Sequence, residues 1–130
     1  MNPDVFQWRE SDVIVRARCI PRYLWMTVSI DVFLDGMCIL RTGGQAKMTG
    51  SVTSCFWFEG TTHEAKLSWQ KYKNHAFPVE LIIDDELVAE SNVAVENWWM
   101  PFVACSVLAI LLLLPVLVVV ALAVLLYVFM

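Results

Sequence analysis

The chain has 130 residues, a formal net charge of −4 and 58% hydrophobic residues. This composition excludes an intrinsically disordered chain and a basic nucleic-acid-binding protein, and the length excludes a multidomain enzyme. The apolar excess is confined to residues 102–130, where Ser106 and Pro115 alone fall outside the apolar set. Without this block the chain is about 48% apolar, an ordinary value for a globular domain. We therefore expect a soluble domain over residues 1–97 and a transmembrane helix over residues 98–130.

The first twelve residues contain Asp4, Arg9, Glu10 and Asp12 and no apolar run of the kind found in signal peptides. We therefore expect a tail-anchored topology, with the N-terminal domain in the cytosol. The three cysteines of the domain form no Cys-x-x-Cys pair, and we expect free thiols.

Apolar and polar residues alternate with a period of two through most of the domain, which predicts strands rather than helices. Asp35-Gly36 is typical of a two-residue hairpin turn, and Gly60 and Asp84-Asp85-Glu86 mark two further turns. The predicted strands cover residues 12–19, 26–34, 37–41, 51–59, 61–70, 79–83 and 87–90. About seven short strands predict an all-β domain, an antiparallel β-sandwich with a barrel as the alternative.

A basic cluster lies near the end of the first predicted strand. It consists of Arg16, Arg18 and Arg22, with Tyr23 and Trp25 close behind. We interpret these residues as a candidate contact patch for a partner protein or a lipid headgroup. The alternative is a strand with solvated arginines.

Charge is distributed unevenly along the domain. Residues 1–50 carry a balance of +1 and residues 51–101 a balance of −5, with six acidic residues between positions 80 and 96. Anionic lipid would repel an acidic flank next to the membrane. We therefore expect the domain to stand off the bilayer or to face a basic partner there.

The sequence predicts no catalytic, cofactor-binding or metal-binding residues. His63 shares a strand face with apolar residues and is interpreted as packed, and His75 lies in a polar stretch typical of a loop. Their spacing matches no zinc motif, and no nucleophile elbow or phosphate-binding loop is present in the sequence. We therefore expect no enzyme. A ligand-binding or hydrolytic domain would instead require a concave pocket around His63, Trp57 and Trp69.

A series of turn and core residues runs through residues 27–92: Asp35-Gly36, Thr49-Gly50, Phe58-Glu59-Gly60, Phe77 and Ile83-Asp84. In this order they resemble the β-sandwich domain of the Fas apoptotic inhibitory molecule family. The resemblance implies a non-enzymatic domain that acts through protein contacts.

The C-terminal block is longer than the roughly 20 apolar residues that a helix needs to cross a bilayer. Trp98 and Trp99 precede it and Tyr127 lies near its end, where aromatic rings favour the headgroup layer. Pro115 is expected to kink the helix.

Cys105 and Ala109 are small residues four positions apart, so they share one helix face and are candidates for packing against another membrane helix. The alternative is a plain anchor with incidental small residues. Besides the bilayer, the expected partner is another membrane protein or a second copy of the chain.

The leading hypothesis is a single-pass, tail-anchored membrane protein whose β-sandwich mediates protein contacts as an accessory or structural subunit of a membrane complex. One alternative is a membrane-anchored protective scaffold of the apoptosis-inhibitor type. A second is an anchored domain that binds a small ligand.

Overall fold

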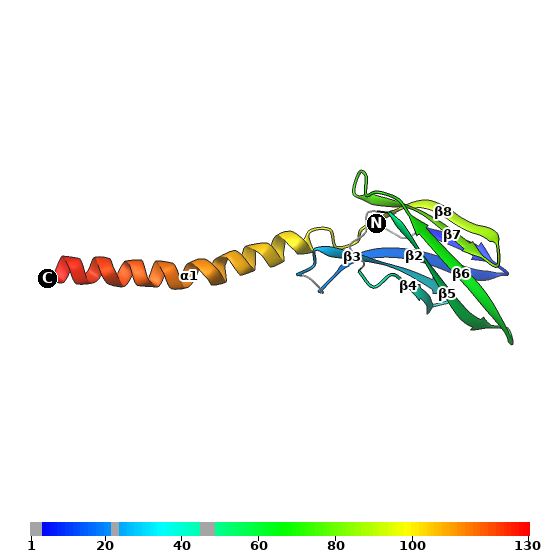
Figure 1. Cartoon of the computed structure of the whole chain (residues 1–130), viewed down its shortest axis with the longest axis horizontal. Helices are drawn as coiled ribbons and strands as arrows, with labels where there is room; N and C mark the ends of the chain where they lie inside the picture. The colour runs from blue at the N-terminus through cyan, green and yellow to red at the C-terminus, as the bar shows by residue number, and fades with distance from the viewer. Residues whose placement is uncertain (1–3, 22–23, 45–48) are drawn as a thin grey trace. The chain divides into compact units, whose positions relative to one another are not determined.

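The chain folds into two compact units, residues 1–98 and residues 99–130. The computed structural model describes residues 4–21, 24–44 and 49–130. Strands make up the first unit and one long helix the second (Figure 1). The predicted combination of an antiparallel β-sandwich and a C-terminal helix is confirmed.

The first unit contains two antiparallel sheets, each of four consecutive strands. Sheet A consists of β1 (Val5–Trp8), β2 (Ser11–Ile20), β3 (Thr27–Leu34) and β4 (Met37–Arg41). Sheet B consists of β5 (Gly50–Phe58), β6 (Thr61–Trp69), β7 (Ala76–Ile83) and β8 (Glu86–Ala94). The described residues therefore form eight strands, not about seven, because the sequence reading missed β1. This strand has only four residues, too few for alternation to show.

Side chains that alternate along the strands form the core between the sheets. On β2 every second residue from Val13 to Cys19 is buried, and the same holds on β6 from His63 to Trp69. Leu67 and Leu81 are completely buried. Full burial of one such side chain contributes about 1.5–3 kcal/mol, so these rows supply most of the driving force for closing the sandwich.

Each of the four hairpins closes with two residues at positive φ, the conformation of type I′ turns. The turns are Arg9-Glu10 (48° and 65°), Asp35-Gly36 (46° and 82°), Glu59-Gly60 (49° and 79°) and Asp84-Asp85 (49° and 62°). All four lie at one end of the sandwich, which we name the turn end (Figure 1). The longer connections between β2 and β3, β4 and β5, and β6 and β7 therefore lie at the opposite end, the loop end.

The two sheets repeat one plan. The Asp35 N–H donates to the carbonyl of Asp12 over 2.9 Å, and the Asp35 carboxylate accepts the Asp12 N–H over 2.8 Å. Asp84 makes the same pair of bonds with Glu64, over 2.9 and 3.0 Å. The register between third and fourth strands also shifts at equivalent places, Val32/Phe33 and Leu81/Ile82.

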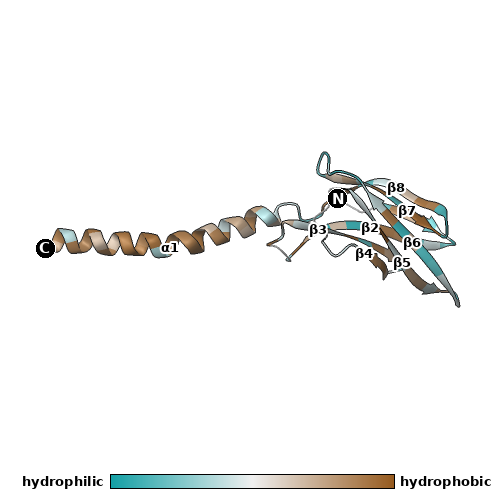
Figure 2. Ribbon diagram, viewed as in Figure 1, coloured by the Kyte–Doolittle hydropathy of each residue, from teal (hydrophilic) through white to brown (hydrophobic). Residues whose placement is uncertain are grey.

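The second unit is α1 (Met100–Phe129), a helix of 30 residues with a mean hydropathy of 3.3 over its most apolar stretch and no buried side chain. At 1.5 Å per residue it is about 45 Å long, more than the roughly 30 Å of a hydrocarbon core. Figure 2 shows hydrophobic colour along almost its whole length. A helix that is apolar on every side needs an apolar environment, so α1 can serve as a membrane anchor.

Candidate functional site

Two residues of the predicted patch, Arg16 and Arg18, lie on the outer face of sheet A, where each faces a carboxylate. The Nε of Arg16 lies 2.6 Å from Oε1 of Glu96, and its Nη2 lies 3.3 Å from Oε2. This forked geometry is the strongest arrangement of an arginine and a carboxylate. Arg16 is therefore engaged with the segment that follows β8.

A buried carboxylate organises the neighbouring part of this face. Asp31 is only 1% exposed, yet Nε of Arg18 lies 3.5 Å from Oδ2 and Nε of Arg41 lies 3.2 Å from Oδ1. The Ser29 hydroxyl also donates to Oδ1 over 2.8 Å. A buried charge is tolerated only when it is paired, and here two guanidinium groups cover one carboxylate. Arg18 and Arg41 thus compensate the buried charge of Asp31 on this sheet face.

The structure brings together only part of the predicted patch. Arg16 and Arg18 lie on the same face of β2, whereas Trp25 is half-buried in the connection to β3, with a φ of 59°. Arg22 and Tyr23 lie outside the described residues. The patch as a contact site stays a prediction.

Residues 95–97 fasten the end of β8 onto sheet A. Val95 forms a parallel bridge with Ala17, and the Glu96 N–H donates to the Ala17 carbonyl over 2.9 Å. The Asn97 side chain then bonds to the backbone of β2 as a neighbouring strand would. Its Oδ1 accepts the Cys19 N–H over 2.5 Å, and its Nδ2 donates to the Cys19 carbonyl over 2.9 Å. We name this set of contacts the Asn97 clamp. The polar side chains of residues 96 and 97 thus have a structural role that alternation alone does not indicate.

A histidine network lies at the turn end of sheet B. His63 is 6% exposed, its Nδ1 lies 2.5 Å from Oδ2 of Asp84, and its Nε2 lies 2.8 Å from the hydroxyl of Thr61. The backbone N–H of Glu64 and the imidazole of His63 hold the pKa of the Asp84 carboxyl below its ordinary value. A carboxylate, an imidazole and a hydroxyl are therefore connected in that order.

Aromatic rings shield this imidazole. The Trp8 ring centre lies 5.2 Å from that of His63, and those of Phe56 and Phe58 lie at 5.6 and 6.4 Å. This enclosure agrees with the reading of His63 as a packed side chain. Trp57, the strand neighbour of two of these rings, is 67% exposed and points to the opposite sheet face. Trp57, His63 and Trp69 therefore do not converge on one pocket.

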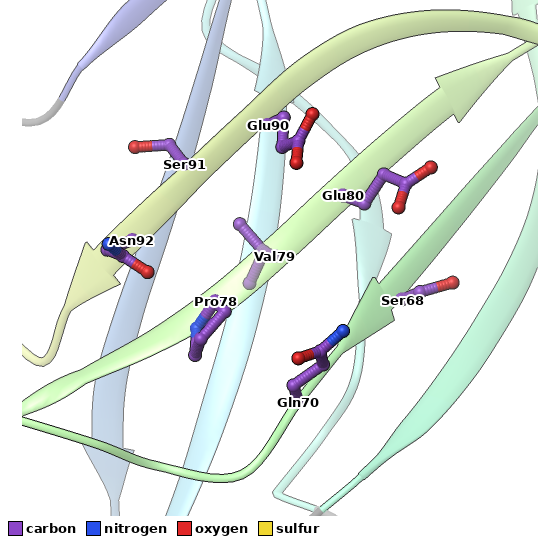
Figure 3. A pocket seen from close by; sticks show the side chains of 8 residues that line it. All are labelled: Ser68, Gln70, Pro78, Val79, Glu80, Glu90, Ser91 and Asn92. Atoms are coloured by element: carbon purple, nitrogen blue, oxygen red, sulfur yellow. The ribbon is translucent and has the colours of Figure 1, made fainter.

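An open depression of about 400 Å³ lies on the outer face of sheet B. Its lining comes from β6, β7, β8 and the residue after β6: Ser68, Gln70, Pro78, Val79, Glu80, Glu90, Ser91 and Asn92. Glu80 and Glu90 are cross-strand partners, and Figure 3 shows their carboxylates beside each other. Small-molecule sites are mostly apolar and enclose their ligand, and this polar surface does not have that character.

The strand β5 forms one edge of sheet B. In the part of the chain that the structure describes, β5 pairs with β6 alone, through nine consecutive rungs without a register shift. Its sequence contains no charged residue and no proline, and Ser51, Thr53, Cys55 and Trp57 are exposed on its outer face. Natural proteins usually protect such an edge with charge, proline or a bulge.

The other edges carry this protection. β1 has four residues and β4 has five, and β4 ends in Arg41. β8 carries Glu86 and Glu90, and its pairing with β7 shifts register. Sequence reading located β5 as a strand but could not show that it is an edge, because strand order is a property of the folded sheet.

The residues predicted at the membrane lie as follows. Trp98 ends the first unit and is 51% exposed, and Trp99 is the N-cap of α1. Tyr127 is in the last turn of α1, and Pro115 lies inside the continuous helix. Cys105 and Ala109 are both in its first half. The interfacial, kinking and packing roles of these residues stay predictions.

No protein-family model, curated protein or solved structure matches the chain. The resemblance to the Fas apoptotic inhibitory molecule family therefore stays a prediction. Several residues that carry it have a structural explanation: Asp35-Gly36 and Gly60 form turns, and a Cβ on Gly50 would lie 2.8 Å from the Trp69 ring.

Proposed function

We propose that the protein is a membrane-anchored adaptor whose β-sandwich binds a partner protein by adding one of the partner's strands to β5. In this role it is an accessory or structural subunit of a membrane complex. The uncharged, regularly paired edge of β5 carries the proposal. Strand addition uses the free backbone donors and acceptors of such an edge for affinity, and the side chains on alternate positions for specificity.

Two further observations support a cytosolic location of the domain and a contact surface beside β5. The exposed thiols of Cys38 and Cys55 fit a reducing compartment, which supports a cytosolic domain. The exposed Trp57 supplies a large, rigid contact surface beside the edge, and tryptophan is enriched among the residues that dominate binding energy. The anchor would place this edge within reach of membrane-bound partners.

Site-specific photocrosslinking in native membranes tests the proposal. A photoreactive amino acid at Thr53, in the middle of β5, is expected to give a discrete adduct with a partner protein. The same amino acid at Asn92, exposed on β8, is the matched control and is expected to give none. Absence of an adduct from position 53, while a reporter within α1 crosslinks to neighbouring proteins, would exclude the β5 edge.

The variant Thr53→Lys tests the β5 edge independently, through the amount of partner that is recovered with the protein. A lysine on an edge strand disfavours strand addition, and we expect recovery of the partner to fall by roughly tenfold. Asn92→Lys is the control and should leave recovery unchanged. In the photocrosslinking experiment, an adduct of twice the chain's mass from position 53 would assign the edge to a second copy of the chain.

A further inference from the structure

The hairpin topology places acidic residues mainly at the turn end of the domain and basic residues at the loop end. The turn end carries five acidic residues and one basic residue in its four turns. At the loop end, the described residues of the three connections (20–21, 24–26, 42–44, 49 and 70–75) contain no acidic residue and two basic ones, Lys71 and Lys73. Glu96, the acid nearest the start of α1 in sequence, is paired with Arg16.

The six acidic residues between positions 80 and 96 do not form one acidic surface next to the start of α1. Asp84 and Asp85 form a turn at the turn end, and Glu86 begins the strand that leads away from it. Glu80 and Glu90 lie opposite each other within the outer face of sheet B. The acids that are close to the membrane segment in sequence are thus mostly remote from the loop end in space.

The loop end also exposes apolar and aromatic side chains. Leu24 is 49% exposed, Met26 64%, Tyr72 40% and Trp98 51%. A row of ring contacts joins the β6–β7 connection to the end of the domain: Tyr72 to His75 at 6.2 Å and His75 to Trp98 at 5.7 Å. Tyrosine and tryptophan beside lysine is the combination that favours the headgroup layer of a bilayer.

The covalent chain limits how far this end can lie from the membrane. Asn97 is bonded to β2, and α1 begins at Met100. Three Cα–Cα steps of 3.8 Å span at most about 11 Å. This limit holds for any angle between the two units, so Asn97 at the loop end always lies within about 11 Å of the start of α1.

We propose that the loop end of the domain docks on the headgroup layer of an anionic bilayer. Trp98, Tyr72, Leu24 and Met26 enter the headgroup region, and Lys71 and Lys73 pair with anionic headgroups. The turn end, with its excess of carboxylates, then faces away from the lipid. This surface is separate from the β5 edge, so it is independent of the proposed strand addition.

Hydrogen exchange of the full-length protein in lipid nanodiscs tests the docking. Amides of residues 70–75 are expected to exchange more slowly in phosphatidylcholine discs that contain 30% phosphatidylserine than in discs of phosphatidylcholine alone. Amides of the four turns should exchange equally in both. Lys73→Glu should reduce the protection by at least about fivefold, because it removes one basic residue from an anionic surface and adds a negative charge.

Lys66→Glu is the matched control, because Lys66 is an exposed lysine on the outer face of β6 and the change in charge is the same. Met26→Ser tests the apolar contribution and should reduce protection in both kinds of disc. Equal exchange in both lipids, or protection that Lys73→Glu leaves unchanged, would overturn the proposal. Protection that instead rises with protein concentration would assign the surface to contacts between copies.

Discussion

At the scale of single residues, Asp84 connects a turn, a strand and a buried imidazole. It occupies the first position of the β7–β8 turn with a φ of 49°, a conformation that aspartate and asparagine tolerate better than most residues. Its carboxylate also receives the N–H of Glu64 and contacts His63. One side chain thus fixes how the turn sits on the neighbouring strand β6.

Replacement of Asp84 by asparagine should lower the thermal midpoint at pH 7, because the neutral amide keeps the turn but loses the negative charge. The pKa of Asp84 is lowered in the folded protein from its ordinary value of 3.8. The stability that its charge confers is therefore complete above that value and is lost as the pH falls through the lower folded value. Thermal unfolding of both proteins between pH 2 and pH 7 should show the difference shrink in acid.

Asp85→Asn is the control for this experiment, since Asp85 is the other residue of the same turn. It should shift the midpoint less at pH 7. A difference between Asp84→Asn and the parent that persisted unchanged at pH 2 would contradict the role given to the charge.

The cysteines of the domain should differ in reactivity. Burial raises the pKa of the Cys19 thiol and removes it from solvent, whereas Cys38 and Cys55 are exposed. Because the thiolate is the reactive form, a maleimide should label Cys38 and Cys55 quickly and Cys19 only upon unfolding. Peptide mass spectrometry over a time course measures this. Rapid labelling of Cys19 in the folded protein would show that the end of β2 opens locally.

At the scale of elements, the turns show where sequence reading succeeds and where it fails. Asp35-Gly36 was predicted because both residues suit positive φ. Arg9-Glu10 adopts the same conformation with residues that disfavour it, so neither this turn nor β1 was indicated by the sequence. The sandwich, which encloses Trp8 against the rings of sheet B, supplies the energy that local preference lacks.

Glu10→Gly should therefore stabilise the domain. A glycine at a φ of 65° avoids the cost of a side chain in the left-handed region, and after the entropy it adds to the unfolded chain we expect a gain of roughly 0.5–1 kcal/mol. Chemical denaturation, monitored by tryptophan fluorescence, measures this change in the free energy of unfolding.

Gly36→Ala is the converse at the same position of another turn. No atom lies within 4 Å of the added Cβ, so its loss of stability reports backbone conformation alone. Should Glu10→Gly destabilise the protein instead, the Glu10 side chain must make a contact worth more than the strain.

The candidate surfaces were predictable only where their residues lie close together in the sequence. The arginines of β2 stand out in the sequence as a cluster, but Asp31, the partner of Arg18, is 13 residues away along the chain, and Glu96, the partner of Arg16, is 80 residues away. Only the pairing of β2 with β3 and with the end of β8 brings these charges together. Long-range pairing of this kind leaves no local pattern to read.

At the scale of the whole molecule, the long apolar helix was the easiest part to predict, because it is a continuous apolar run. The separation of charge between the turn end and the loop end was not predictable by adding charges along the sequence. Because the two-residue turn between β7 and β8 lies at the turn end, Asp84 and Asp85 lie there although they are close to the helix in sequence.

Asn97→Ala should weaken the connection between the domain and the chain that continues to α1. It removes two hydrogen bonds and leaves the N–H and carbonyl of Cys19 unpaired, which costs about 1–3 kcal/mol. We expect faster hydrogen exchange at Cys19 and in residues 95–97, with the turns unaffected. Asn92→Ala, an exposed asparagine on β8, is the control. Unchanged exchange at Cys19 would mean that the Asn97 clamp is not what holds this segment.

The direction of the Asn97 clamp has a mechanical consequence. Residues 95–97 run parallel to β2, and their bonds to Ala17 and Cys19 lie side by side along that strand. Tension that reaches the domain through the helix and acts along β2 therefore shears these bonds together, where a perpendicular pull would open them one at a time. A pull of this kind on α1 is resisted by sheet A as well as by β8, the strand that precedes α1 in the chain.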